Sequence, residues 1–318
     1  MPRKFASVPK IAYIYANINL YSHVMMKKIL LSVLIVCSVI FTSFAQTNNR
    51  YSLAPVVLDT PDFNGMNLQC SNKNVALQQL SKVSNGITDT DLWIKSHLPD
   101  KINSSYTFTP GGNRASDELK SKVPLVYQDK VRRSIDLHGA YNVIYYGERD
   151  EYGGDFGVNP TLVVVTGSDL SKVLYSFDFS NFSVYKYTKS EEQDFTKISV
   201  SNVVVEDNVL YANIAHRTYS SSSSGYNAYL VAVDLETKGI KWVTKPLTCK
   251  ANFIIDNDLI YTGYGFTKEE DYIYVIDKAS GTRLHAIKVE KGPEYFAVKD
   301  GKLYVRTYSL DYVFQIVR

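Results

Sequence analysis

Two hairpin-like stretches in the C-terminal half of the chain repeat at a fixed interval. The first, YLVAVDLETKGIKWV (residues 229–243), alternates apolar and polar residues, breaks at a turn and alternates again up to a tryptophan. The second, YIYVIDKASGTRLHAI (residues 272–287), does the same. Asp234 and Asp277 are 43 residues apart, and so are Trp242 and His285. A constant interval between such hairpins indicates a repeated structural unit.

A second kind of hairpin precedes each of these stretches. Tyr211, Tyr261 and Tyr304 occupy the same place after its turn, at intervals of 50 and 43 residues. The longer interval matches the insertion TYSSSSSGYN at residues 218–227. Each unit therefore has four short strands, and units of roughly 40–45 residues with four strands are typical of β-propeller blades. We predict an all-β propeller of four-stranded antiparallel blades.

The extent of the propeller follows from the length of the chain. At one blade per 43 residues, residues 46–318 form a single domain of about six blades, with five or seven as alternatives. The last blade lacks an outer strand, and we expect an N-terminal strand to close it, with YSLAPVVLD (residues 51–59) as the donor. Residues 61–130 are irregular. Within them, NKNVALQQLSKV (72–83) suggests a short helix and FTPGGNRASDELKSK (108–122) suggests a loop.

The stretch AVDLETKGIKW (residues 232–242) resembles the repeat of pyrroloquinoline-quinone-type propellers. That repeat has Ala-x-Asp, then Thr-Gly, then Trp ten residues after the alanine. Ala232, Asp234, Thr237 and Trp242 match in place, while the glycine is displaced by one position to Gly239. The resemblance implies a quinoprotein-like propeller, in which the aspartate and the tryptophan are structural.

The next repeat, VIDKASGTRLH, keeps Asp277 and Gly281, has Ser280 for the threonine and places His285 where the tryptophan would stand. The resemblance is clearest over residues 196–318, weaker over 131–195 and absent over 46–130. Because many propellers with this repeat bind no quinone, it supports an architecture and no cofactor.

Quinone chemistry in this fold requires a tryptophan beneath the cofactor, a calcium ion held by carboxylate and amide ligands, and a catalytic aspartate. The chain has only two tryptophans, Trp93 and Trp242, and no adjacent pair of cysteines. We therefore expect no cofactor.

The N-terminus has the layout of a secretory signal peptide. Met26-Lys27-Lys28 is followed by the apolar run ILLSVLIVCSVIF (residues 29–41) and by Ser43-Phe44-Ala45, a small-x-small cleavage site. The run is shorter than the roughly 20 apolar residues of a membrane-spanning helix. We expect residues 1–45 to be removed and the protein to be periplasmic or extracellular, with an uncleaved anchor as the alternative. Residues 1–25 are interpreted as an over-extended gene start.

The charge balance depends on this N-terminal segment, which contains five basic residues and no acidic one. The rest of the chain carries 30 basic and 32 acidic residues, so nucleic acid is not a favoured partner. No transmembrane segment is expected in the mature chain. Cys70 and Cys249 either form a disulfide or remain two buried thiols.

No pattern in the sequence indicates catalysis or metal binding. The histidines outside the N-terminal segment are isolated from one another, and the acidic runs GERDEYGGD (147–155) and KEED (268–271) lack the spacing of a calcium loop. No Gly-x-Ser-x-Gly sequence is present, and the five serines 220–224 are interpreted as a flexible loop. We expect no catalytic, cofactor-binding or metal-binding residues.

Three long connections between the second and third strands of a blade are expected to emerge on one face. They span residues 147–159, 216–227 and 263–271 and are rich in aromatic and arginine residues, which favour binding when a rigid scaffold holds the loops. The candidate partner-binding residues are Arg149, Tyr152, Phe156, His216, Arg217, Tyr219, Tyr226, Tyr264 and Phe266.

We therefore expect an exported, non-catalytic binding or scaffold protein that recognises a protein, peptide or glycan through this face. The oligomeric state is left open. The alternative is a propeller enzyme acting on a polysaccharide or a related substrate at the mouth of the channel. An enzyme would bring together two carboxylates, or a histidine and a carboxylate, with perturbed pKa values.

Overall fold

The computed structural model describes residues 51–59, 71–86, 90–97, 117–138, 140–149, 158–182 and 184–318. The chain divides into two compact units, residues 1–52 and 53–318, and the following concerns the second. The expected signal peptide, Cys70, Tyr152 and Phe156 lie outside the described residues. No helix among the described residues is long and apolar enough to cross a bilayer.

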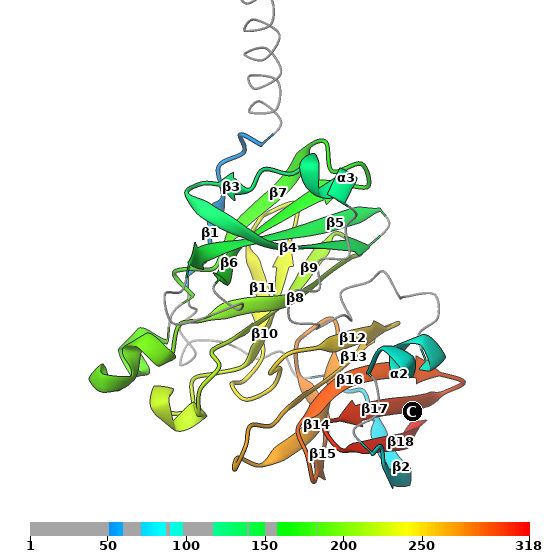
Figure 1. Ribbon diagram of the computed structural model, residues 1–318. Coiled ribbons are helices and arrows are strands. Elements are labelled where there is room, and N and C mark those ends of the chain that lie inside the picture. Colours follow the sequence, from blue (N-terminus) through cyan, green and yellow to red (C-terminus); the bar gives the residue numbers. More distant parts are fainter. Residues whose placement is uncertain are drawn as a thin grey trace, which may run out of the picture. The chain divides into compact units, whose positions relative to one another are not determined.

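The first sheet has six strands in the order β1-β7-β6-β5-β4-β3 (Figure 1). Its four central strands pair antiparallel and follow one another in the chain, as predicted. The short strand β1 pairs parallel with β7, and β3 forms a hairpin with β4. The bounds are β1 Val56–Val57, β3 Val126–Tyr127, β4 Lys130–His138, β5 Tyr141–Arg149, β6 Val158–Gly167 and β7 Val173–Asp178.

The second and third sheets each have four antiparallel strands in chain order. Both coincide with the predicted hairpin pairs, including the two stretches that repeat after 43 residues. The second sheet contains β8 Ser199–Glu206, β9 Val209–Ala215, β10 Tyr229–Asp234 and β11 Ile240–Val243. The third contains β12 Phe253–Asp256, β13 Leu259–Tyr264, β14 Asp271–Asp277 and β15 Arg283–Val289.

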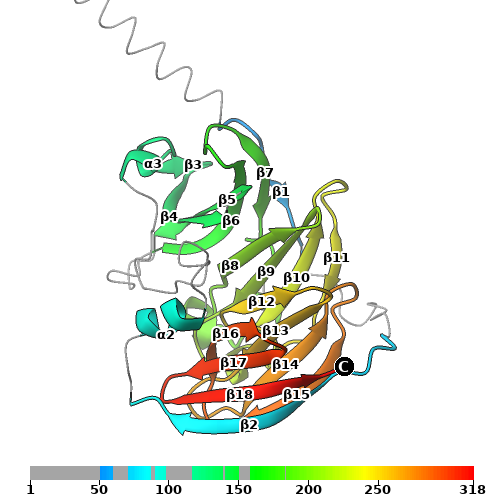
Figure 2. The ribbon, with the colours of Figure 1, turned by 90° about the vertical axis from the view of Figure 1, so that its right-hand side faces the viewer.

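The fourth sheet is completed by an N-terminal strand. Its order is β16-β17-β18-β2, with bounds of Pro293–Lys299, Lys302–Thr307, Leu310–Val317 and Ala76–Ser84. Figure 2 shows β2 running alongside β18, which comes from the other end of the chain. Closure of the last sheet by an N-terminal strand is thus confirmed, but two finer expectations were wrong. The donor is residues 76–84 rather than 51–59, and residues 72–83 contain this strand rather than a helix.

Consecutive sheets pack face to face through continuous apolar clusters. One cluster joins the first and second sheets, another the second and third, and a further one the third and fourth. In β10, Val231 and Val233 face the first sheet while Leu230 and Ala232 face the third, because side chains alternate along a strand. Burial of both faces explains the almost continuous apolar runs in the sequence.

This stacking of four-stranded antiparallel sheets is that of propeller blades, so the predicted fold class is confirmed. The described residues form three such sheets and the six-stranded first sheet, and the expected number of about six blades is not confirmed.

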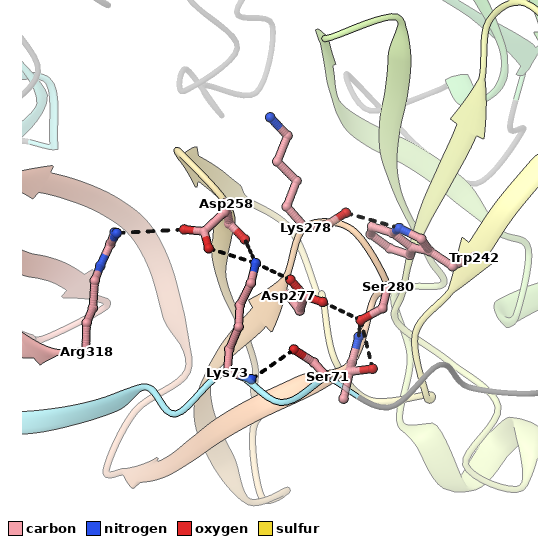
Figure 3. A network of polar contacts seen from close by, with 9 residues as sticks. Ser71, Lys73, Trp242, Asp258, Asp277, Lys278, Ser280 and Arg318 are labelled. Atoms are coloured by element: carbon pink, nitrogen blue, oxygen red, sulfur yellow. Dashed lines mark hydrogen bonds and ion pairs between the residues drawn. The ribbon is translucent and has the colours of Figure 1, made fainter.

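Asp234 and Trp242, the aspartate and tryptophan of the first repeat, both make contacts that stabilise the fold. Asp234 Oδ1 accepts hydrogen bonds from the backbone N–H groups of Glu236 (3.0 Å) and Thr237 (2.9 Å), which shapes the turn after β10. Trp242 Nε1 donates to the carbonyl oxygen of Lys278 in the next sheet at 3.2 Å. This contact fixes the second sheet to the turn between β14 and β15 (Figure 3).

Asp277 connects this turn to the segment that precedes β2. Ser280 Oγ donates to Asp277 Oδ2 at 2.6 Å, and Lys73 Nζ lies 2.6 Å from Asp277 Oδ1 and 2.7 Å from Asp258 Oδ2. Arg318 also pairs with Asp258 (Figure 3). Residues from both ends of the chain therefore meet on the third sheet.

The remaining elements are short helices. They are α2 (Thr90–His97), α3 (Asp117–Ser121) and the 3-10 turns η3 (Tyr185–Tyr187), η4 (Ser190–Phe195) and η5 (Ser220–Ser223). Helix α3 lies within residues 108–122, which were expected to form a loop. Cys249 is a buried free thiol, so it forms no disulfide in the structure.

Candidate functional site

A cavity of about 760 Å³ opens where the loops of the second, third and fourth sheets meet. Its wall is made of the start of β8, the end of β9, the segments leading into β12 and β16, and the connections β13–β14 and β17–β18. The charged and aromatic residues in the wall are His216, Arg217, Lys250, Phe266, Asp271, Glu290, Lys291, Glu294, Tyr295 and Tyr308.

Strand direction explains why these segments lie together. In a four-stranded antiparallel sheet, the connection from strand two to strand three leaves at one end. Strand four runs parallel to strand two, so it finishes at that same end, and the chain enters the next sheet from there. Loops of both kinds therefore gather on one face in every consecutive sheet. This face is the one that the sequence predicted to carry the long connections.

His216 lies at the start of the connection between β9 and β10 and is fully buried. Its Nε2 is 2.7 Å from Ser223 Oγ, and its backbone N–H donates to Asn227 Oδ1 at 2.9 Å. Burial, with a further contribution from the charge of Lys250, lowers the pKa of His216 to about 4, so the ring is neutral at neutral pH. Both side chains of this pair are buried. We interpret its role as holding the loop.

The serine-rich loop is ordered, contrary to the expectation of a flexible segment. Ser220–Ser223 form the 3-10 turn η5, and Ser222 and Ser223 are buried. Ser222 Oγ donates to Glu192 Oε2 at 2.8 Å. On its other side, Ser220 donates to Glu269 Oε1 through both N–H and Oγ, each at 2.7 Å. Glu269 thereby ties the loop of the second sheet to that of the third.

Lys250 occupies the wall between these two loops. Its Nζ donates to the carbonyl oxygen of His216 at 2.9 Å and lies 4.4 Å from the centroid of the Phe266 ring. Burial and the neighbouring charge of Arg217 lower the pKa of Lys250 to about 8, against the opposing effect of Glu269. The ammonium group remains mostly protonated at pH 7.

Asp271 and Glu294 are two of the three acidic residues in the cavity wall. Burial raises the pKa of Asp271 and of Glu294, and nearby basic residues oppose the shift in both cases. Asp271 lies close to two glycines: a Cβ at Gly265 would come within 1.9 Å of its Oδ1, and one at Gly292 within 3.3 Å. These glycines allow the carboxylate to sit against the backbone.

The structure brings several of the predicted site residues together. His216, Arg217 and Phe266 line the cavity, and Tyr219 packs edge-on against Phe266 with ring centroids 5.1 Å apart. Tyr264 lies beneath this layer, buried, with its hydroxyl donating to Glu269.

Two other predicted residues lie apart from this cavity wall. Tyr226 stacks on Tyr187, with ring centroids 3.6 Å apart, and Arg149 ends β5 in an exposed position. Neither lines the cavity. Tyr152 and Phe156 lie outside the described residues, so their part in a binding surface stays a prediction.

The sequence analysis missed the contribution of the segments that enter β12 and β16, namely residues 250–252 and 290–293. They carry Lys250 and Lys291, and Glu294 follows directly. The alternation of strand direction could have identified them, because it places the entry to each blade on the same face as its long loop.

Within the part of the chain that the structure describes, no group of three His, Cys, Asp or Glu side chains is placed to hold a metal ion.

No protein-family model matches the chain, and no curated protein matches it. Several solved structures show partial similarity. A quinohemoprotein alcohol dehydrogenase from Pseudomonas putida HK5 overlaps with 54% of this chain and 27% of its own, at 12% identity and a TM-score of 0.34. A europium-containing methanol dehydrogenase overlaps with 56% of this chain and 40% of its own, at 10% identity and a TM-score of 0.35.

BamB from Moraxella catarrhalis overlaps with 60% of this chain and 70% of its own, at 10% identity and a TM-score of 0.28. In the two dehydrogenases, by contrast, the overlap covers well under half of the chain length. The assignment of the fold rests on the sheets described above.

Proposed function

We propose that this protein is an exported, non-catalytic binding module that holds a protein, peptide or glycan partner in the loop-lined cavity. The observation that carries the proposal is a cavity of about 760 Å³ whose walls come from three consecutive sheets. Ligand sites are typically concave, about 300–1,000 Å³ in volume, and largely preformed. The hydrogen bonds of Glu269, His216 and Asn227 hold the loops in place before any partner arrives.

Export is the second part of this proposal, and it rests on the layout of residues 26–45. N-terminal sequencing of the protein recovered outside the cytoplasm should begin at Gln46. A chain that keeps Met26 and remains in the cytoplasm would contradict it.

The cavity can be tested by filling it. Ala251 lines the wall, so Ala251→Trp should occupy the space and abolish capture of a partner that binds there. Ala279 is exposed in the turn between β14 and β15, which leaves the sheet at the opposite end, so Ala279→Trp is the matched control. Both variants should melt like the parent protein. Equal capture of a cross-linked partner by both variants would overturn the proposal.

A second candidate function is acid–base catalysis on a polysaccharide. The observation in its favour is that Asp271 and Glu294 both line the cavity and both have raised pKa values. If the protein is such an enzyme, Asp271→Asn and Glu294→Gln should each abolish release of reducing sugar from a panel of polysaccharides. A binding module should release none with or without these substitutions.

A further inference from the structure

Lys250 is held at three points, which fixes where its ammonium group lies. Its backbone N–H donates to the carbonyl oxygen of Gly263 at 2.9 Å. Its own carbonyl oxygen accepts from Asn213 Nδ2 at 3.3 Å, and its Nζ donates to His216 O at 2.9 Å. These partners belong to the second and third sheets. The side chain is therefore placed in the cavity wall by the fold itself.

Among the described residues, the Lys250 ammonium forms no ion pair with a carboxylate. Glu269 influences it at longer range, but that carboxylate is already engaged by Ser220 and Tyr264. An ammonium group has three donors, and Lys250 uses one of them on His216. A partly buried ammonium group with two unused donors in a cavity wall favours a ligand that supplies an anionic acceptor.

The surrounding aromatic rings argue for a peptide rather than a sugar. Lys250 covers one face of Phe266, and Tyr219 forms a T-shaped contact with the same ring. Tyr295 is only 6% exposed. Of the aromatic rings in the described wall, Tyr308 alone is widely exposed, at 64%. Tyr308 is therefore the one ring of the described wall that is open for a sugar to stack on, whereas Phe266 beside Lys250 is partly covered.

We propose that Lys250 binds the carboxylate of an acidic side chain in a peptide segment that occupies the cavity. The inference rests on the proposed binding function and adds the chemistry of the ligand. The ammonium of Lys250 donates two hydrogen bonds to the carboxylate, while Asp271 and Glu294 of the same wall accept from peptide N–H groups.

The test uses a random 12-residue peptide library displayed on phage and selected on the purified protein. We expect the enriched peptides to share an Asp or Glu at one position. Lys250→Met should weaken binding of a labelled enriched peptide by about 10-fold, measured by fluorescence polarisation. Lys291→Met, which removes an exposed lysine of the same wall, should change binding less than twofold.

A change in the peptide keeps the test independent of the folding of the variant. Replacing its acidic residue by Gln or Asn should weaken binding to the parent protein by the same factor and should have no further effect on Lys250→Met. Enriched peptides that lose binding to Ala251→Trp but tolerate Lys250→Met would overturn the inference and leave the binding function intact.

If every enriched peptide binds Ala251→Trp as tightly as the parent protein, the inference is overturned, and the result counts against the cavity as the binding site. A tetragalacturonate probe covers the sugar alternative. If this oligosaccharide binds in a Lys250-dependent manner and no peptide does, the carboxylate belongs to a sugar and the peptide assignment is wrong.

Discussion

The indole ring of Trp242 lies against the backbone of Gly281 in the neighbouring sheet. A Cβ at position 281 would come within 2.6 Å of Cε3 of the indole, and Gly281 has a φ of +70°. Gly281→Ala should therefore lower the free energy of unfolding by about 2–4 kcal/mol, because it adds overpacking to left-handed backbone strain. Urea denaturation followed by tryptophan fluorescence measures the change.

The matched control for this prediction is Gly301, which has the same φ of +70° but open space around it, the nearest atom to an added Cβ being 3.8 Å away. Gly301→Ala should cost only the backbone strain, about 1 kcal/mol. Equal effects at the two glycines would show that the contact with Trp242 contributes nothing.

Lys73 anchors the segment before β2 to the third sheet through Asp277 and Asp258. Although burial opposes it, the hydrogen bonds from Lys73 and Ser280 keep the pKa of Asp277 below its ordinary value. Lys73→Met should lower stability by about 1–2 kcal/mol at pH 7, because it leaves a mostly buried carboxylate with the Ser280 hydroxyl and the Ala279 backbone N–H as partners but no positive charge. This stabilisation is present above the ordinary pKa of 3.8 and is lost as the pH falls below it, so the two proteins should converge in acid.

The control for Lys73 is Lys288, whose pair with Glu270 is exposed on both sides. Lys288→Met should change stability by less than about 0.5 kcal/mol. A loss as large as that of Lys73→Met would indicate a general effect of removing positive charge.

Strand β2 presents one buried and one exposed leucine three residues apart. Leu77 is 6% exposed and belongs to the cluster between the third and fourth sheets, whereas Leu80 is 50% exposed. Leu77→Ala should cost about 2–4 kcal/mol in chemical denaturation, and Leu80→Ala less than about 1 kcal/mol. Similar costs at both positions would contradict the pairing of β2 with β18.

The buried His216 makes stability depend on pH. Its folded pKa of about 4 lies below the ordinary value of 6.5, so the unfolded chain binds the extra proton between these values. The stabilisation from the neutral His216 should be fully present above pH 6.5 and fall by about 3 kcal/mol as the pH approaches 4. His216→Gln should lack this part of the decline. Parallel stability curves for the two proteins between pH 4 and 7.5 would refute the assignment.

Much of the fold could be predicted because the strands from residue 131 onward are short, apolar and separated by clear turns. The 43-residue spacing of Asp234 and Asp277 identified equivalent positions in two blades, and both aspartates have structural roles. Trp242 was expected to be structural, and it contacts Gly281 of the next sheet.

The outer strand of the last sheet could not be placed because its sequence is misleading. Residues 76–84 are polar at most positions, and only one residue, Leu77, is buried. An edge strand buries one face at most, so its apolar signal is weak. The segment reads as a helix by composition, and its pairing with β18, more than 200 residues later, decides its conformation.

The cavity was predicted only in part. Aromatic residues in the β9–β10 and β13–β14 connections drew attention to Phe266 and Tyr219, whereas Lys250 stands in the connection between β11 and β12, which has no distinctive composition. Its importance comes from the hydrogen bonds of Asn213, Gly263 and His216, which come from other segments of the chain. No local pattern carries that information.

The pairing of β2 with β18 also sets an order of events during synthesis. Residues 76–84 leave the ribosome more than 200 residues before their partner, residues 310–317, is made. Until then β2 has no paired strand in its sheet, so the segment that contains Lys73 is not held at its C-terminal end. A contact of such long sequence separation slows folding. For the exported protein that we propose, this delay would keep the last blade open while the chain crosses the membrane.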